Sequence, residues 1–348
     1  MLLYLHIPFC DSKCSYCSFN SFTNLEHYYN SYMSALHNSL KEQLNNLNQN
    51  IETIFIGGGT PSTISYKEYE PIFKELEPYI KKGIEVTTEA NPNSATKEWL
   101  EGMFALGINR VSFGVQSFNE KKLKLLNRAH SAKEAIKAIE SANKVGFKNI
   151  SLDIIYDVAG DSKELIVSDL EQAFKLPINH ISSYELTIEK ATSFAKTPEV
   201  KKDSEELGFF LRDYILKQGF TQYEVSNYGL YQSQHNLGYW QYKDYLGIGA
   251  GAVGFINKQR LYPHTNIEKF IKEPHFKRVE ELSREDILTE KIFLGLRSIV
   301  GIKEELLTKS MQQNANILVK EQKLEYKNST YFNKEFFLSD ELALFILG

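Results

Sequence analysis

The three cysteines of this 348-residue chain lie close together, at Cys10, Cys14 and Cys17. Thiolates are soft ligands that favour iron–sulfur clusters, zinc and copper(I), and an iron–sulfur cluster is normally held by four of them. A four-iron cubane with three protein ligands keeps one iron whose coordination is open to a small molecule. The C-x3-C-x2-C spacing therefore predicts a reactive 4Fe–4S cluster rather than a structural metal site.

Two other uses of these cysteines fit the sequence less well. A structural zinc ion needs four closed ligands, and His6 is the only nearby candidate for the fourth. A disulfide framework is disfavoured because the number of cysteines is odd and because a chain of this length does not need such cross-links.

The pattern along the first half of the chain predicts the elements that position the cysteines. Six short runs are rich in β-branched and aromatic residues, with helical patterns between them. These runs are residues 2–8, 53–56, 84–88, 110–115, 149–155 and 180–186. One helix is clearly marked, since Ser131 and Glu134 form a capping box and Gly146 follows its last turn. Six successive βα units predict a parallel sheet.

Residues that could bind a ligand follow the ends of these runs. Loops at the carboxyl ends of parallel barrel strands converge on one face, and the cysteine loop follows the first run. The second run ends in glycines, whose missing side chains let the backbone approach a ligand. Polar residues follow the later runs, and each of them alone would be interpreted as a helix cap or as part of a surface ion pair. Together they stand at successive loops on one face, and with the glycine run the set is Gly58, Gly59, Thr60, Glu89, Gln116, Arg128 and Asp153.

The cysteine loop and its flanks resemble a known family. Tyr4-Leu-His-Ile-Pro-Phe-Cys10, followed by Lys13-Cys-Ser-Tyr-Cys17, is similar to the opening of the radical S-adenosylmethionine (SAM) superfamily, in its branch related to oxygen-independent coproporphyrinogen III oxidase. The resemblance implies an α/β fold with a partial (β/α)6 TIM-like barrel. It also implies that the open iron binds the amino and carboxylate groups of SAM.

The same resemblance implies roles for individual residues. The segment Gly57-Gly-Gly-Thr-Pro61 would contact the amino group of SAM, Arg128 a carboxylate and Asp153 a ribose hydroxyl. The full set of implied cofactor contacts is Tyr4, Gly58, Gly59, Thr60, Glu89, Gln116, Arg128 and Asp153. Asp157-Val-Ala-Gly160 departs from the Gly-Leu-Pro-Gly of relatives, which leaves the local loop shape open.

A second motif distinguishes branches of this family. His235-Asn-Leu-Gly-Tyr239-Trp240 resembles the HNxxYW motif of the heme chaperone branch, HemW. The resemblance implies that His235 is an axial ligand of heme iron and that Tyr239 and Trp240 offer flat surfaces to the porphyrin. Neutral imidazole is a common heme ligand, although a histidine beside aromatic residues is more often a packed core group.

The oxidase itself is the alternative within the family. That branch has a long extension before the cluster loop and a further cysteine two positions after the third, where this chain has Phe19. We therefore expect a chaperone that binds a 4Fe–4S cluster, SAM and heme and delivers heme to apo-hemoproteins such as respiratory enzymes. A radical enzyme with an unrelated substrate is a third hypothesis, in which His235 and Trp240 belong to the core.

The second half of the chain predicts two further regions. Residues 1–190 are expected to form the barrel, 191–265 a connecting region that carries the heme motif, and 266–348 a helical, winged-helix-like domain. Ser283 and Asp286 form a capping box there, and residues 326–338 suggest a hairpin. The helix between them has an apolar stripe of Leu288, Ile292, Leu296 and Ile299. The G-x-G-x-x-G run at residues 249–254 precedes an extended segment rather than a helix, so NAD or FAD is not expected.

Composition favours an ordinary globular protein. Hydrophobic residues make up 42% and charged residues 24%, and the net charge is -4, so no nucleic-acid partner is expected. The apolar run at residues 246–256 is too short to span a bilayer, and no signal peptide is evident. We expect a cytoplasmic protein without a transmembrane segment. The electron donor, the recipient hemoproteins and formation of a homodimer are left open.

Overall fold

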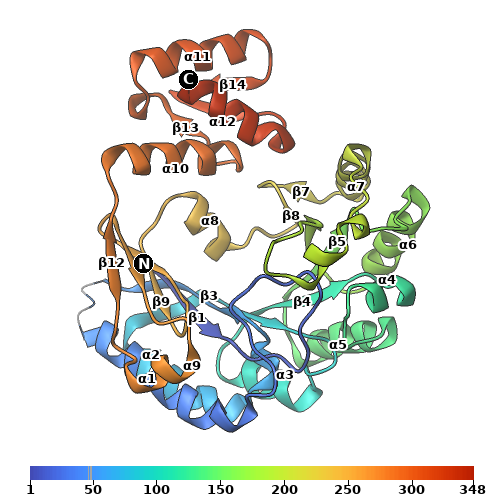
Figure 1. The fold of residues 1–348 in the computed structure, drawn as a ribbon, viewed down its shortest axis with the longest axis vertical. Helices are drawn as coiled ribbons and strands as arrows, with labels where there is room; N and C mark the ends of the chain where they lie inside the picture. Colours follow the sequence, from blue (N-terminus) through green and yellow to red (C-terminus); the bar gives the residue numbers. More distant parts are fainter. Residues whose placement is uncertain (46, 48) are drawn as a thin grey trace.

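The computed structural model describes residues 1–45, 47 and 49–348. Its centre is a run of parallel strands in chain order, and each of the six predicted strands is confirmed within a few residues. Figure 1 shows these strands forming a curved sheet with helices packed on its outer side. The six strands are β1 (Leu2–Ile7), β2 (Ile51–Gly58), β3 (Ile80–Ala90), β4 (Arg110–Gln116), β5 (Asn149–Tyr156) and β6 (His180–Glu185). The partial (β/α)6 barrel is therefore confirmed.

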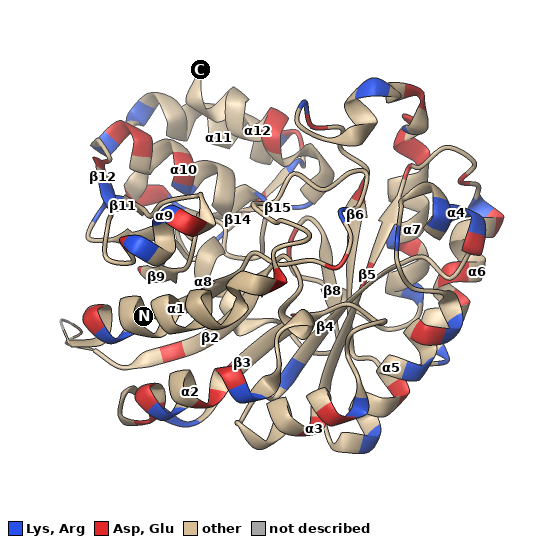
Figure 2. Cartoon of the chain, turned by 60° about the horizontal axis from the view of Figure 1, so that its bottom comes forward, with Lys and Arg blue, Asp and Glu red and all other residues tan. Residues whose placement is uncertain are grey.

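The helices between the strands cover the outer face of the sheet. They are α1 (Tyr29–Asn45), α2 (Glu70–Leu76), α3 (Lys97–Ala105), α4 (Glu120–Leu125), α5 (Ala132–Val145) and α6 (Lys163–Phe174). The predicted capping box starts α5, where Ser131 accepts from the Glu134 amide and Glu134 accepts from the Ser131 amide. Gly146, with φ +122°, ends the helix as expected. Figure 2 shows acidic and basic residues of the helices on the outer surface of the barrel.

Side chains alternate between the two faces of each barrel strand. One set is apolar and fully buried against the helices, as with Leu3 and Leu5 of β1 and Ile54 of β2. The other set is largely polar and points into the barrel, as with Glu89 of β3 and Asp153 of β5, which line a cavity there. This polar lining distinguishes the sheet from the fully apolar strands of an inert parallel core.

Six short strands extend the sheet beyond the barrel, in the order β12-β11-β10-β9-β1 at one edge and β6-β8-β7 at the other. They are β7 (Thr221–Gln222), β8 (Asn227–Gly229), β9 (Tyr245–Ile248), β10 (Gly254–Ile256), β11 (Gln259–Tyr262) and β12 (Arg278–Glu281). Only β9 runs parallel to its barrel neighbour. The chain passes from β9 through a turn into β10 and β11, so the glycine-rich run has no helix after it, as the sequence indicated.

The remaining helices include the one that carries the heme motif. The connecting helices are α7 (Glu205–Lys217), α8 (Gln234–Trp240) and α9 (Ile267–Lys272). The C-terminal elements are α10 (Arg284–Leu296), β13 (Ile302–Lys303), α11 (Lys309–Lys320), β14 (Leu324–Lys327), β15 (Thr330–Asn333) and α12 (Ser339–Leu347). None of the helices in the described part of the chain has the length and apolar character that crossing a bilayer requires.

The C-terminal extension is α+β, as predicted. Ser283 and Asp286 cap α10, and the hairpin forms between β14 and β15, a few residues earlier than expected. Ile299 lies beyond the end of α10 and is 42% exposed, so it does not belong to the apolar stripe. A separate apolar core begins in α10, whereas α9 packs with the barrel core and β12 pairs with β11. The domain boundary expected near residue 265 thus lies before α10, where that second core begins.

Candidate functional site

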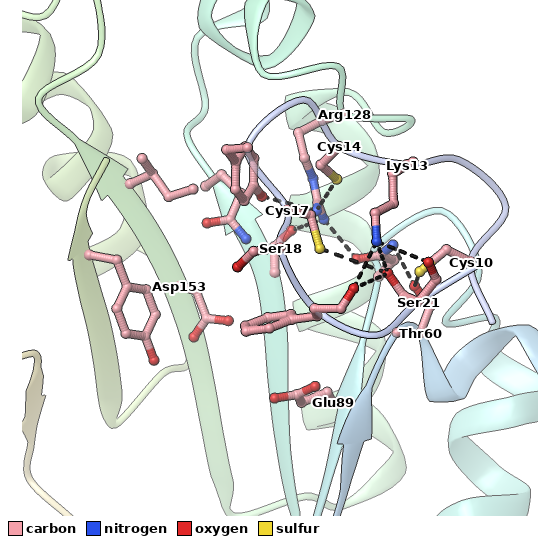
Figure 3. A pocket seen from close by; sticks show the side chains of 18 of the residues that line it. Cys10, Lys13, Cys14, Cys17, Ser18, Ser21, Thr60, Glu89, Arg128 and Asp153 are labelled. Atoms are coloured by element: carbon pink, nitrogen blue, oxygen red, sulfur yellow. Dashed lines mark hydrogen bonds between the residues drawn. The ribbon is translucent and has the colours of Figure 1, made fainter. Parts of the chain in front are cut away.

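The cysteines border a cavity of about 350 Å³ at the carboxyl ends of the barrel strands. The loop that carries them follows β1 and is closed by backbone hydrogen bonds between Cys10 and Phe22 (2.9 Å) and between Phe22 and Pro8 (2.7 Å). Within the loop, the Lys13 ammonium donates to the carbonyl oxygens of Phe19 and Ser21, both at 2.9 Å. The cysteine loop is therefore ordered by its own side chains (Figure 3).

Each cysteine sulfur has a polar neighbour on the cavity wall. The Thr60 hydroxyl donates to Cys10 Sγ at 3.3 Å, and Arg128 Nη1 donates to Cys14 Sγ at 3.2 Å. Cys17 Sγ lies 3.8 Å from the Ser21 hydroxyl. All three cysteines line the same cavity, as ligands of one shared centre must.

His6 is not free to complete a zinc site. Its Nδ1 lies 2.8 Å from the Tyr4 hydroxyl, and its Nε2 lies 2.9 Å from the Asn20 carbonyl oxygen. Burial lowers the pKa of His6. Tyr4 points into the barrel below the cavity and does not line it, so its contact with a cofactor stays a prediction. In this structure Tyr4 and His6 support the cysteine loop from beneath.

The glycines after β2 allow the cysteine loop to pack directly on their backbone. Gly59 N donates to the Ile7 carbonyl and Thr60 N to the Phe9 carbonyl, both at 2.7 Å. A Cβ atom at Gly59 would lie 2.6 Å from the Phe9 carbonyl oxygen, and one at Gly58 would lie 2.4 Å from the His6 ring. Both glycines are therefore required by close approach, and Gly58 also has φ +114°.

Two acidic side chains form the floor of the cavity. Glu89 Oε2 accepts from Gly58 N at 3.0 Å, and Asp153 Oδ1 accepts from the Ser112 hydroxyl at 3.3 Å. Burial, reinforced by the nearby Asp153 charge, raises the pKa of Glu89 to about 7. Burial likewise raises the pKa of Asp153 to about 6. The floor is thus acidic and poorly solvated, and it would favour a cationic or hydroxyl-bearing ligand.

Arg128 and Gln116 occupy the opposite wall. Besides Cys14, Arg128 donates through Nη2 to Asn91 Oδ1 at 2.7 Å and to the Gly114 carbonyl at 2.5 Å. Gln116 has φ +68° and a buried Oε1 atom without a hydrogen-bond partner in the described part of the chain. Strained backbone and an unpaired polar atom at a cavity wall are common where a ligand binds.

Asn91 is a site residue to which the sequence analysis gave no role. Its Nδ2 donates to Thr60 Oγ1 at 3.1 Å while its Oδ1 accepts from Arg128, so it links the neighbours of Cys10 and Cys14. The signal was its position two residues after Glu89, just past the end of β3. Tyr184 and Ser112 also line the cavity, and only the spatial arrangement of β4 and β6 identifies them.

The heme motif lies elsewhere in the barrel. His235 is in α8, and its Nδ1 lies 2.8 Å from the hydroxyl of Thr53, in the first half of β2. Gly58, which lines the cysteine cavity, is five residues further along that strand, or about 16 Å. Figure 1 shows α8 between the barrel strands and α10. The structure therefore brings the predicted SAM contacts other than Tyr4 together around one cavity, whereas His235 lies near the opposite end of β2.

His235 is completely buried. Its Nε2 lies 3.0 Å from the Tyr239 hydroxyl, and the Phe55 ring packs 5.2 Å away, centroid to centroid. Burial and the Arg110 charge lower the pKa of His235 to about 3, so the ring is neutral at physiological pH. Tyr239 packs edge-on against His235, whereas Trp240 is partly exposed at the end of α8. As a ligand of heme iron, His235 stays a prediction.

Known proteins similar to this chain agree with the geometry. The model of the radical SAM superfamily matches residues 4–173. The heme chaperone HemW of Buchnera aphidicola is 36% identical over 90% of this chain and 86% of its own length. The heme chaperone HemW of Escherichia coli is 37% identical over 78% of this chain and 74% of its own length.

A solved structure resembles the whole fold. Coproporphyrinogen III oxidase (HemN) from Escherichia coli, a radical SAM enzyme, superposes with a TM-score of 0.83 over 99% of this chain and 89% of its own, at 17% identity. At that identity the likeness concerns the fold alone. The barrel and the three cysteines agree with the sequence identity to relatives over most of the chain, so this chain belongs to the HemW family of the radical SAM superfamily.

Proposed function

We propose that this protein is a heme chaperone that binds a 4Fe–4S cluster, SAM and heme and passes the heme to apo-hemoproteins. Membership in the radical SAM superfamily implies the cluster and SAM, and the relatives that match most of the chain are named heme chaperones. The observation that carries the cluster is the cavity bordered by three thiols with no fourth cysteine in the chain.

The residues around the cavity suit these two cofactors. Cys10, Cys14 and Cys17 would hold the cluster and leave one iron for SAM, which is the chemistry that such a cluster supplies. Arg128 would meet the SAM carboxylate, since a guanidinium pairs well with a carboxylate. The acidic floor at Glu89 suits the amino and sulfonium groups, and Asp153 suits a ribose hydroxyl. Gln116 Oε1, buried and unpaired, offers a further acceptor.

Heme would bind away from this cavity, with His235 as the axial ligand and with Tyr239 and Trp240 beside the porphyrin. The lowered pKa of His235 supports this role because a ligand must be neutral, and no proton competes with iron for the ring at physiological pH. The two hydroxyl partners of the ring must leave before iron can bind. We also infer that the protein works in the cytoplasm and that its recipients are apo-hemoproteins such as respiratory enzymes.

A second candidate is oxygen-independent coproporphyrinogen III oxidase. The observation that favours it is the fold, which matches the solved oxidase structure over nearly the whole chain. Against it stands Phe19, two positions after Cys17, where the oxidase branch carries a cysteine. The two candidates differ in whether a porphyrin is carried unchanged or decarboxylated.

One experiment separates them. The experiment titrates four proteins with heme under anaerobic conditions, namely the wild type, His235→Ala, Cys14→Ala and the surface control His27→Ala. Each protein is also assayed for coproporphyrinogen conversion with SAM and a reductant. We expect stoichiometric heme binding that is lost only in His235→Ala, cluster absorbance that is lost only in Cys14→Ala, and no conversion. Conversion by the wild type, with heme binding indifferent to His235, would establish the oxidase instead.

A further inference from the structure

A buried carboxylate holds the start of the heme-motif helix. Glu85 lies on β3, is only 7% exposed, and accepts hydrogen bonds from His235 N at 2.9 Å and from Gln234 N at 2.8 Å. It also accepts from the Ser233 hydroxyl at 3.2 Å and from the Tyr231 hydroxyl. One side chain of the barrel therefore receives four donors from the segment 231–235. None of these contacts concerns the cysteine cavity.

In this arrangement heme iron cannot reach His235. Both ring nitrogens are engaged, one by the Thr53 hydroxyl and the other by the Tyr239 hydroxyl. The Phe55 ring packs beside the imidazole, and the side chain has no exposed surface. A porphyrin is a wide planar ring with its iron at the centre, so an axial histidine must project from a surface that the plane can approach. Ligation therefore requires α8 to move away from β2 and β3.

The surroundings of α8 permit such a movement. The helix has only seven residues, which is too short to be stable without its tertiary contacts. A second cavity, of about 230 Å³, lies between α8 and the first halves of the neighbouring strands and is lined by Thr53, Glu85, Gln234 and Lys243 among others. The buried Leu237 and the close packing of Gly238 on Leu2 also hold α8 on the barrel. The four hydrogen bonds to Glu85 are the polar restraint at the start of the helix.

We propose that Glu85 is a positioning residue that holds α8 closed over His235 and so controls the access of heme to its ligand. This inference rests on the proposed function. If heme binds only the open form, its apparent dissociation constant equals the intrinsic constant divided by the open fraction. Weakening the contacts of Glu85 increases that fraction, so heme binds more tightly and faster.

The test compares Glu85→Gln with the wild type and with Glu224→Gln. Glutamine keeps the shape of the side chain but replaces one acceptor oxygen by a donor that faces the amides of α8. Glu224 is a matched control because it is also a buried carboxylate, 1% exposed, that accepts from a backbone amide, at Ser226 and not in α8. Tyr231→Phe removes a single donor to Glu85 and serves as a milder variant should Glu85→Gln fold poorly.

Two measurements are made on the cluster-loaded protein, namely an anaerobic stopped-flow titration with heme and hydrogen exchange of the Gln234 and His235 amides without heme. We expect Glu85→Gln to bind heme about tenfold more tightly and with a faster association rate, with Tyr231→Phe changed in the same direction by less. Amide exchange in α8 should accelerate in both variants. Glu224→Gln should match the wild type in both measurements.

The outcomes separate this inference from the proposed function. If His235→Ala abolishes heme binding while Glu85→Gln leaves affinity, rate and amide exchange unchanged, Glu85 does not restrain the helix. Weaker heme binding in Glu85→Gln would likewise overturn the inference, because Glu85 would then organise the bound state. If His235→Ala binds heme normally, the proposed ligand is wrong. The double variant Glu85→Gln with His235→Ala should bind no heme, and binding by it would show that the gain arises elsewhere.

Discussion

Replacing Glu89 by glutamine should remove a large part of the pH dependence of stability in the cofactor-free protein. Glu89 is partly buried at the cavity floor, and desolvation there together with the charge of Asp153 raises its pKa to about 7. In the unfolded chain the same carboxyl titrates near 4.5. Between these values the folded protein holds a proton that the unfolded chain has released, so the stability of the wild type falls as the pH rises from about 5 to 7.

The magnitude follows from the two pKa values. Their difference, at ~1.4 kcal/mol per pKa unit, corresponds to ~3 kcal/mol of unfolding free energy lost at about pH 8 relative to about pH 4. Glutamine has nearly the same shape, and its oxygen can still accept from Gly58 N. The variant also removes the repulsion that acts on Asp153. We therefore expect Glu89→Gln to be more stable than the wild type by ~3 kcal/mol at about pH 8, and the two to converge near pH 4.

Thermal and urea unfolding at several pH values measures this effect. For a chain of this size, ~3 kcal/mol corresponds to a rise in Tm on the order of 5 °C at alkaline pH. Glu140→Gln, on the exposed surface of α5, serves as the control and should follow the wild-type curve. The reasoning is refuted if the wild type and Glu89→Gln lose stability in parallel as the pH rises.

Two other substitutions test the support around the site. Lys122 and Asp161 form an ion pair at 2.8 Å in which both side chains are almost completely buried. Lys122→Ala should therefore lower the unfolding free energy, measured by urea titration, by ~3–5 kcal/mol. The control Lys121→Ala, at an exposed position, should change it by less than ~0.5 kcal/mol. Equal denaturation midpoints would contradict this. Gly59→Ala should force the cysteine loop away from β2 and reduce anaerobically reconstituted iron severalfold. Gly107→Ala strains the backbone at φ +96° but its Cβ would meet no atom within 4 Å, so this control should keep its iron. Full iron in Gly59→Ala would disprove the steric argument.

Much of the fold and of the first site was determined by the sequence. Hydrophobic runs with turn signals between them identify the six barrel strands, because strand periodicity and capping are local properties. The three cysteines and the glycines after β2 are also local signals, since their chemistry depends on residue type and short spacing. The rule that parallel strands present their carboxyl ends on one face was enough to predict that Glu89 and Asp153 belong with the cysteines.

Other features were decided only by tertiary contacts. Asn91 acquires its role because Thr60, just after β2, and Arg128, just after α4, lie on either side of its amide. The pairing of β12 with the barrel sheet arises from long-range register that no local pattern encodes. Such contacts depend on how distant segments meet, and the chain carries no periodic signal for them.

The clearest case is the heme motif. The sequence by itself determined that His235, Tyr239 and Trp240, which lie on the short helix α8, stand within six positions in a motif that resembles that of heme chaperones. Only the tertiary structure decided that this helix closes on the barrel, that Thr53 and Tyr239 occupy both ring nitrogens, and that Glu85 holds the segment before it. The reason is physical, because residue type fixes what an imidazole can bind, whereas burial and long-range hydrogen bonds fix whether a ligand can reach it.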